Sequence, residues 1–244
     1  MKKSFHLVLS LMLVAVSCNC AQTCEQKVTT VAVDTSNAGL KIYYPNFTSI
    51  DLVCGTVPSA DDDSVIMFCE AAFTNYLMDE FTHKNIQCSH ASGGVFYKGA
   101  RTQRNNGAFV YYDGNWKFVH RESNPSVLDA AIDSAAARGG MGFCQEMFIH
   151  NGLEVEHTRK DENCNLFRAL CSIDGKLCVA DATDAVTFRD FIDNLLAAGV
   201  TEALYLDMGS GWNYSWYRPH PGDSPVIIHP KTHSYITNWI TFYY

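Results

Sequence analysis

The segment from Leu166 to Asp181 constrains the fold of this chain more than any other part of the sequence. Two strand-like runs, Leu166 to Ile173 and Lys176 to Asp181, flank the dipeptide Asp174-Gly175. Asp-Gly is typical of a two-residue turn between antiparallel strands, because both turn positions adopt a positive φ. The pattern therefore predicts a β-hairpin.

The residues after this hairpin predict a helix and one more strand. Thr187 suits an N-cap, and apolar residues follow it at three- and four-residue spacing until Gly199, which is placed to end the helix. Ala203 to Leu206 then predicts a strand that delivers Asp207 into a glycine-containing turn. Side chains and free backbone N–H groups gather at such strand ends, so we expect the functional site to include this turn.

The rest of the chain alternates strand-like runs with turns and contains one more predicted helix, which begins at Asn124-Pro125 and ends before Gly139-Gly140. The other predicted strands are Val28 to Val33, Gly39 to Tyr44, Val65 to Phe73, Gly93 to Tyr97, Phe109 to Tyr112 and Trp116 to His120. With no repeat or linker, residues 22–244 are expected to form one α+β domain. Its expected architecture is a mixed, largely antiparallel sheet with packed helices.

The first 21 residues predict an export signal. Met1-Lys2-Lys3 is positive, and the apolar run from Leu7 to Val16 is about ten residues long, too short for a permanent membrane helix. Cleavage after Ala21 is one interpretation. The other is a lipoprotein signal, in which Cys18 becomes a lipid-bearing terminus. Either one predicts a periplasmic, secreted or cell-surface protein, and no later stretch is apolar enough to predict a membrane span.

The charge balance excludes one class of partner. Removal of Lys2 and Lys3 with the signal takes the net charge from −8 to −10. An acidic chain lacks the basic footprint that nucleic-acid binding requires. An anionic substrate stays compatible, because local charge matters more than the sum.

Eight cysteines remain after cleavage at Ala21, and an exported chain permits disulfides. Cys171 and Cys178 flank the Asp174-Gly175 turn and are expected opposite each other at a hydrogen-bonded position, where Cα atoms stand further apart. The number of bridges stays open. We expect no metal site: the cysteine spacings match no zinc pattern, and Pro230 opposes a helix between His229 and His233.

Three charged residues lie in or beside apolar strands, where a charge is unfavourable unless it is paired or functional. Glu70 lies in Phe68-Cys69-Glu70-Ala71-Ala72-Phe73, Arg168 in Phe167-Arg168-Ala169-Leu170, and Asp207 in Leu206-Asp207-Met208-Gly209-Ser210-Gly211. Arginine grips phosphate oxygens with a bidentate fork, and carboxylates supply acid, base or nucleophile. Arg101 and Arg104 lie in a polar loop, expected in solvent but within reach of a phosphate.

The order of these motifs resembles the phosphodiester glycosidase family. The other segments that carry the resemblance are Ser92-Gly93-Gly94-Val95-Phe96 and Phe148-Ile149-His150-Asn151-Gly152. The stretch from Arg168 through the helix to Asp207 resembles the family's arginine–hairpin–helix–aspartate pattern in order and spacing. The family usually has asparagine and glycines at Glu70-Ala71-Ala72, and glycine at Met208.

The resemblance implies hydrolysis of a sugar 1-phosphodiester without a cofactor. Its implied catalytic residues are Asp207, Glu70 and Arg168, with Arg168 on the phosphate and the carboxylates sharing the acid/base or nucleophilic work. The implied substrate-binding residues are Gly94, Asn151, Gly209, Ser210, Gly211, Trp212, Asn213, Tyr214 and Arg218. The expected partner is a carbohydrate or sugar phosphate.

Two other interpretations stay open. The departures at Met208 and Glu70 are compatible with a glycan-binding protein that has no activity. Alternatively, Arg168 and the carboxylates merely pair in the core of a structural protein.

Overall fold

We analysed a computed structural model that describes residues 27–75, 80–122, 124–157, 159, 163–209, 213–232 and 235–244. The expected signal segment, including Cys18, lies outside the described residues. So do three of the expected substrate-binding residues: Ser210, Gly211 and Trp212.

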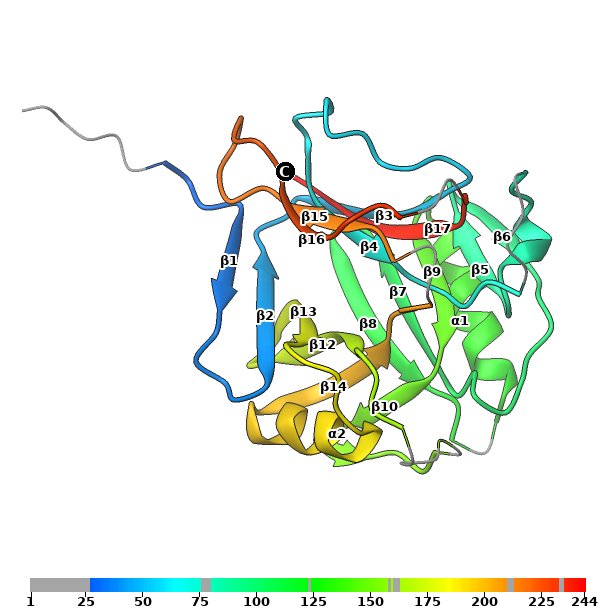
Figure 1. Ribbon diagram of the computed structural model, residues 1–244. Helices are drawn as coiled ribbons and strands as arrows, with labels where there is room; N and C mark the ends of the chain where they lie inside the picture. The colour runs from blue at the N-terminus through cyan, green and yellow to red at the C-terminus, as the bar shows by residue number, and fades with distance from the viewer. Residues whose placement is uncertain are drawn as a thin grey trace, which may run out of the picture.

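The described strands form three antiparallel sheets (Figure 1). The first sheet contains the predicted hairpin at its centre. In spatial order its strands are β1 (Val31–Asp34), β2 (Leu40–Pro45), β13 (Lys176–Ala182), β12 (Arg168–Ile173), β14 (Val200–Tyr205), β10 (Met147–His150) and β11 (Leu153–Glu154).

The second sheet joins strands that are far apart in the sequence. Its spatial order is β16 (Val226–His229), β15 (Ser215–Tyr217), β4 (Val65–Glu70), β17 (Asn238–Tyr243) and β3 (Ser49–Cys54). The third sheet has the order β6 (Val95–Tyr97), β5 (His90–Ser92), β9 (Met141–Gln145), β7 (Gly107–Tyr112) and β8 (Asn115–His120). A short 3₁₀ turn, η1 (His83–Asn85), precedes β5.

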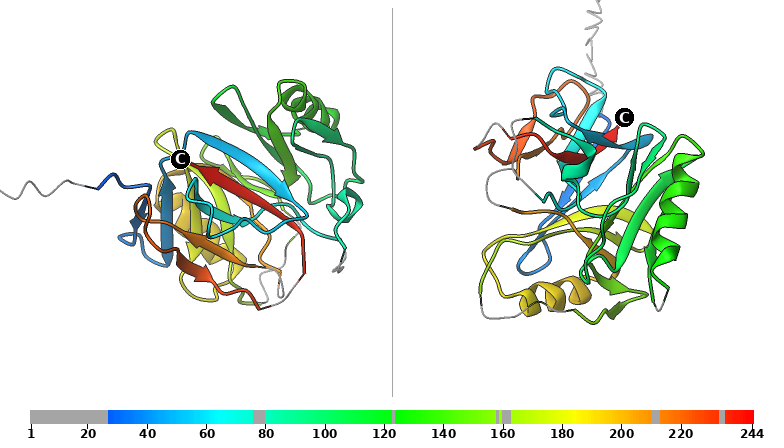
Figure 2. Two further views of the ribbon diagram at one scale, coloured as in Figure 1. Left: turned by 90° about the horizontal axis from the view of Figure 1, so that it is seen from above. Right: turned by 90° about the vertical axis from the view of Figure 1, so that its right-hand side faces the viewer.

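The described helices cover the outer faces of two different sheets (Figure 2). Helix α1 (Ser126–Ala136) packs on the third sheet, and the side chain of Asn124 accepts a hydrogen bond from the Ser126 N–H at its start. Helix α2 (Phe188–Ala197) packs on the first sheet, and the Thr187 hydroxyl caps it by accepting from the Asp190 N–H. Neither helix is long and apolar enough to cross a membrane.

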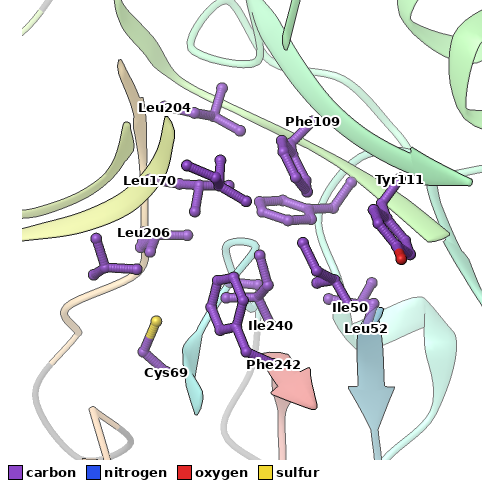
Figure 3. Close-up of a cluster of buried hydrophobic side chains, with 14 of the residues drawn as sticks. Ile50, Leu52, Cys69, Phe109, Tyr111, Leu170, Leu204, Leu206, Ile240 and Phe242 are labelled. Carbon is purple, nitrogen blue, oxygen red and sulfur yellow. The ribbon is translucent and has the colours of Figure 1, made fainter. Parts of the chain in front are cut away.

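The central core lies where the three sheets meet. Leu52 of β3, Ile240 of β17, Phe109 of β7 and Leu204 of β14 all pack into this one cluster (Figure 3). Alternation along the hairpin divides its two faces: Leu170 faces this cluster, whereas its neighbours in β12 face α2. The three sheets therefore share one interior.

The expected α+β class with largely antiparallel pairing is confirmed, and the strands are divided among three sheets. Cys171 and Cys178 lie directly opposite each other, as predicted from the turn, and both are free thiols. The second sheet differs most from expectation. Of its strands only β4 was predicted, because the others lie in short runs among prolines or polar residues.

Candidate active site

The folded chain brings Glu70, Arg168 and Asp207 to one place. Glu70 ends β4, Arg168 begins β12, and Asp207 follows β14. Two backbone hydrogen bonds connect these segments: the Leu206 N–H donates to the Arg168 carbonyl (3.0 Å), and the Asp207 N–H donates to the Ala71 carbonyl (3.2 Å). All three side chains are buried. The site therefore forms where the first sheet meets the second.

Arg168 is fully buried and forms an ion pair with Asp181. Its Nε donates to one carboxylate oxygen at 2.5 Å, and its Nη2 donates to the other at 2.9 Å. The Nη2 atom also donates to the Ser215 hydroxyl at 3.0 Å. The bidentate grip that we expected on a phosphate is thus made on Asp181. Whether Arg168 also contacts substrate stays a prediction.

The turn of the hairpin explains why these two residues meet. Counting outward from Asp174-Gly175 places Arg168 opposite Asp181, and the observed register agrees. The two residues lie on the face of the hairpin that points to the central core. A charge there is tolerated because its partner faces it directly across the strands.

Glu70 lies beside this ion pair without a strong partner of its own. One of its carboxyl oxygens accepts from the Trp239 indole at 3.3 Å. The other, Oε2, lies 4.0 Å from Nη1 of Arg168, and neither of these two buried atoms has a hydrogen-bond partner. An unsatisfied donor and an unsatisfied acceptor therefore face each other in the core, an arrangement that is unusual outside functional sites.

The pKa values of the two carboxyl groups around Arg168 are shifted in opposite directions. Burial raises the pKa of Glu70 well above its ordinary value of 4.5, and the charge of Arg168 offsets only part of this effect. Burial acts in the same sense on Asp181, but the charge and hydrogen bonds of Arg168 lower its pKa below 3.8. One cation serves two carboxyls: its charge favours the ionised form of Asp181, whereas burial favours the protonated form of Glu70.

Asp207 is held at the start of the turn after β14. The Gly209 N–H donates to its Oδ1 at 3.0 Å, and the Met208 N–H donates to the Tyr205 hydroxyl at 3.2 Å. Met208, which departs from the family pattern, packs against the cluster beneath α2. The backbone of this turn is therefore fixed by Asp207 and Tyr205.

A cavity of about 250 Å³ is connected to Asp207 through a short series of hydrogen bonds. The Ala71 carbonyl, which accepts from Asp207, also accepts from the Gln145 side chain at 3.3 Å. The next residue, Glu146, lines the cavity and accepts from Tyr205 through its backbone carbonyl at 2.8 Å. The cavity is lined by Gln103, Arg104, Asn106, Arg121, Glu146, Glu156 and His157.

The cavity contains cations that sequence reasoning did not assign to the site. Arg104 and Arg121 both line it, and Arg159 binds Glu146 at its wall with a 2.7 Å ion pair. Arg101 points elsewhere and pairs with Asp129 on α1. Arg104 matches the expectation of a solvent-facing arginine, whereas Arg121 follows β8 and carried no motif.

Three expected substrate-binding residues lie away from Glu70 and Asp207. Asn151 lies in the turn before β11 and binds Glu202 near the start of β14, five residues and roughly 17 Å of extended chain from Asp207. Arg218 lies at the other end of β4, where its guanidinium donates to backbone carbonyls of the loop from Ala60 to Val65 and of Asp223. Gly94 packs against the end of α1.

The other expected substrate-binding residues that the structure describes lie closer to Glu70 and Asp207. Gly209 bonds to Asp207, and Asn213 and Tyr214 lead into β15, which pairs with β4. The Tyr214 ring packs on Phe68 with centroids 5.3 Å apart, and Phe68 lies two residues before Glu70 in β4. Tyr214 is therefore near the carboxyl cluster.

Sequence reasoning missed Asp181, Ser215, Trp239 and His229 as members of this cluster. His229 lies 3.5 Å from the Asp181 carboxylate, and Trp239 reaches Glu70 from β17. Asp181 was accessible from the turn count that pairs the two cysteines. The other three come from strands of the second sheet whose pairing leaves no local pattern.

Comparison with known proteins supports the fold. The catalytic domain of zebrafish N-acetylglucosamine-1-phosphodiester alpha-N-acetylglucosaminidase, auto-inhibited by pro-peptide, matches with a TM-score of 0.52 and 11% identity, over 90% of this chain and 83% of that chain. The chain shares the fold of this glycosidase domain. A hypothetical protein from Synechocystis matches with a TM-score of 0.56 and 11% identity, over 86% of this chain and 61% of that chain. No protein-family model and no curated protein sequence matches.

The Arg168–Asp181 pair predicts a large effect of breaking it. Asp181→Asn leaves a buried guanidinium without its charge partner and should lower the free energy of unfolding by about 3–5 kcal/mol. Asp193→Asn removes an exposed partner of Arg189 on α2 and should change it by less than about 1 kcal/mol. Urea unfolding at pH 7 measures both. Similar small losses would contradict the structural role of the pair.

The raised pKa of Glu70 predicts a pH dependence of stability. Above pH 4.5 the unfolded chain loses this proton while the folded chain holds it, so the free energy of unfolding falls as pH rises toward the folded-state pKa. The slope reaches at most about 1.4 kcal/mol per pH unit. Glu70→Gln should remove this slope, and Glu80→Gln, at an exposed site, should not. Denaturant unfolding between pH 4 and 8 tests this, and a slope unchanged by Glu70→Gln would contradict it.

Proposed function

We propose that this chain is an exported hydrolase that cleaves a sugar 1-phosphodiester. The observation that carries the proposal is that buried Glu70, whose pKa is raised, and buried Asp207 lie on segments joined by the hydrogen bond from the Asp207 N–H to the Ala71 carbonyl. The same carbonyl accepts from Gln145, whose neighbour Glu146 lines a cavity with two arginines. Acid and base roles in glycoside cleavage are divided between carboxyls whose environments separate their pKa values. The shared fold with a glycosidase catalytic domain supports the proposal by analogy.

The carboxyls divide the chemistry at the anomeric carbon. Glu70, whose raised pKa favours its protonated form, serves as the acid and gives its proton to the phosphate oxygen that leaves. Asp207 serves as the base that activates water or as the nucleophile. A phosphate monoester is a good leaving group, so weak acid assistance is sufficient.

Arg168 acts as a positioning residue in this proposal, with its Nη1 facing the reacting groups. Its other donors hold Asp181 and Ser215, which fixes the guanidinium rigidly beside Glu70. Only the Nη1 atom is without a hydrogen-bond partner. It therefore stabilises the carboxylate that Glu70 becomes after it releases its proton.

The phosphate of the substrate binds in the cavity. Arg104 is exposed and Arg121 half-buried, so both guanidinium groups are accessible to an anion. The oxygens of a phosphodiester can accept hydrogen bonds from two guanidinium groups. Glu146 in the cavity wall follows Gln145, whose side chain donates to the same Ala71 carbonyl as the Asp207 N–H. The sugar then lies toward Asp207 and Gly209.

Sugar-phosphate binding without turnover is the second candidate. The near-complete burial of Glu70 and Arg168, 1% and 0% exposed, favours it, because neither side chain contacts solvent directly. Saturable binding of a sugar 1-phosphodiester with no release of sugar would support this candidate over hydrolysis.

Asp207 provides the direct test of hydrolysis. Asp207→Asn should lower kcat/KM on the cleaved member of a panel of α- and β-linked sugar 1-phosphodiesters by more than about a hundredfold, because an amide is neither base nor nucleophile. Release of free sugar is the measurement, and circular dichroism verifies folding. Asp184→Asn, at an exposed carboxylate, is the control and should leave the rate unchanged. Full activity in Asp207→Asn would remove Asp207 from the mechanism.

The cavity arginines predict a separate effect on substrate binding. Arg104→Gln and Arg121→Gln should each raise KM for the diester by about tenfold or more, because each removes a charge-assisted hydrogen bond to phosphate. Arg101→Gln lies in the same loop as Arg104 but pairs with Asp129, so it should leave KM near the wild-type value. Initial-rate kinetics measure the three variants. An equal rise in KM for Arg101→Gln would contradict a specific phosphate site.

A further inference from the structure

A second cluster of reactive side chains lies apart from the carboxyl site. Cys54 at the end of β3, His83 in η1 and His90 at the start of β5 place one sulfur and two ring nitrogens within 4.8 Å of one another. The cluster joins the second sheet to the third. His90 is buried, whereas Cys54 and His83 are partly exposed, so one side of the cluster is accessible.

The two imidazoles are already arranged as a chelating pair. Nδ1 of His83 lies 2.9 Å from Nε2 of His90, and the ring planes differ by only 21°. The Tyr97 ring stacks on both, at 3.5 Å from the His83 centroid and 5.1 Å from that of His90. Tyr97 therefore restricts the rotation of both rings.

The hydrogen bonds of His90 indicate which nitrogen carries a lone pair. Its Nδ1 lies 3.5 Å from the Cys88 carbonyl, to which only an N–H can donate. Nε2 is then the unprotonated nitrogen, directed at His83. A histidine whose Nδ1–H is directed at a backbone carbonyl while Nε2 is free is the usual arrangement of a zinc-ligating histidine.

We propose that Cys54, His83 and His90 bind a single Zn²⁺ ion. In tetrahedral zinc the ring nitrogens of two histidines lie about 3.3 Å apart, and nitrogen and sulfur about 3.6 Å apart. The His83–His90 separation of 2.9 Å therefore needs to open by only a few tenths of an ångström. One cysteine and two histidines are ligand types that zinc prefers.

Binding of Zn²⁺ releases one proton and moves another. The Cys54 thiol loses its proton to solvent and binds as thiolate, since a coordinating thiol is deprotonated by the metal. His83 stays neutral but carries its proton on Nε2 instead of Nδ1. Three protein ligands leave the fourth position of the tetrahedron open on the exposed side, where water or an anionic group binds.

No sequence motif indicates this site, because its ligands come from three separate segments. The spacings from Cys54 to His83 and from His83 to His90 match no zinc motif. The packing of the segment before η1 against the end of β3 brings the three together: the Phe81 ring lies against Gly55. Gly55 directly follows Cys54, and Phe81 lies two residues before His83.

Cobalt substitution tests the proposal without using enzyme activity. The full chain is stripped of metal with a chelator and titrated with Co²⁺, then with Zn²⁺ as competitor. We expect one equivalent of Co²⁺ to produce a thiolate-to-metal absorption band together with visible bands of tetrahedral intensity. We also expect Zn²⁺ to displace it and to raise the Tm of the wild-type chain.

Three variants and one control define the ligands. Cys54→Ser should abolish the thiolate band, and His83→Gln and His90→Gln should each weaken Zn²⁺ binding by about a hundredfold or more. Cys164→Ser is the matched control, because Cys164 is an exposed free thiol distant in sequence. Thermal unfolding of the metal-free variants verifies that each is folded. If buried His90→Gln does not fold, Cys54→Ser and partly exposed His83→Gln carry the test.

Three absorption results would overturn the proposal. They are the absence of a thiolate band in the wild type, a band that persists in Cys54→Ser, and a band that disappears in Cys164→Ser. Retained wild-type Zn²⁺ affinity in folded His83→Gln would likewise exclude the site.

Discussion

The buried ion pair between Arg168 and Asp181 determines the character of the carboxyl site. It lies at the start of the central hairpin, where a guanidinium could not remain in the core without a facing carboxylate. Arg168 forms both of its carboxylate hydrogen bonds with Asp181. Its Nη1 atom lies 4.0 Å from Glu70, so the guanidinium stabilises the charge of Glu70 only weakly. The state of Glu70, and with it the division of acid and base roles, follows from this competition for a single cation.

The hairpin also shows how much of the structure could be predicted from the sequence. The Asp174-Gly175 turn, the Thr187 cap and the strand before Asp207 are local signals, and each corresponds to an observed element. The strand begins three residues earlier than predicted, at Val200. The register from the turn correctly placed Cys171 opposite Cys178. The same register contains the Arg168–Asp181 pair, so the main partner of the predicted arginine was within reach of local reasoning.

The rest could not be predicted because it depends on contacts between distant segments. Trp239 reaches Glu70 only because β17 inserts between β3 and β4, and nothing in the tail sequence specifies that insertion. Arg121 and Glu146 meet at one cavity through loops of two different sheets. Asn151 and Arg218 were both expected at the substrate site, yet hydrogen bonds hold them at the far ends of β14 and β4.

The strand order of the second sheet has a consequence for the folding kinetics of this chain. Strand β4 pairs with β15 and β17, and β3 pairs with β17, so these neighbours are separated by more than a hundred residues of sequence. Closing such long loops before any pairing energy is gained makes folding slow. The hairpin and α2 can form early from local contacts, whereas the environment of Glu70 exists only after the last long-range pairing. Until then the edges of β3 and β4 are open to other chains, which makes this sheet the place where aggregation begins.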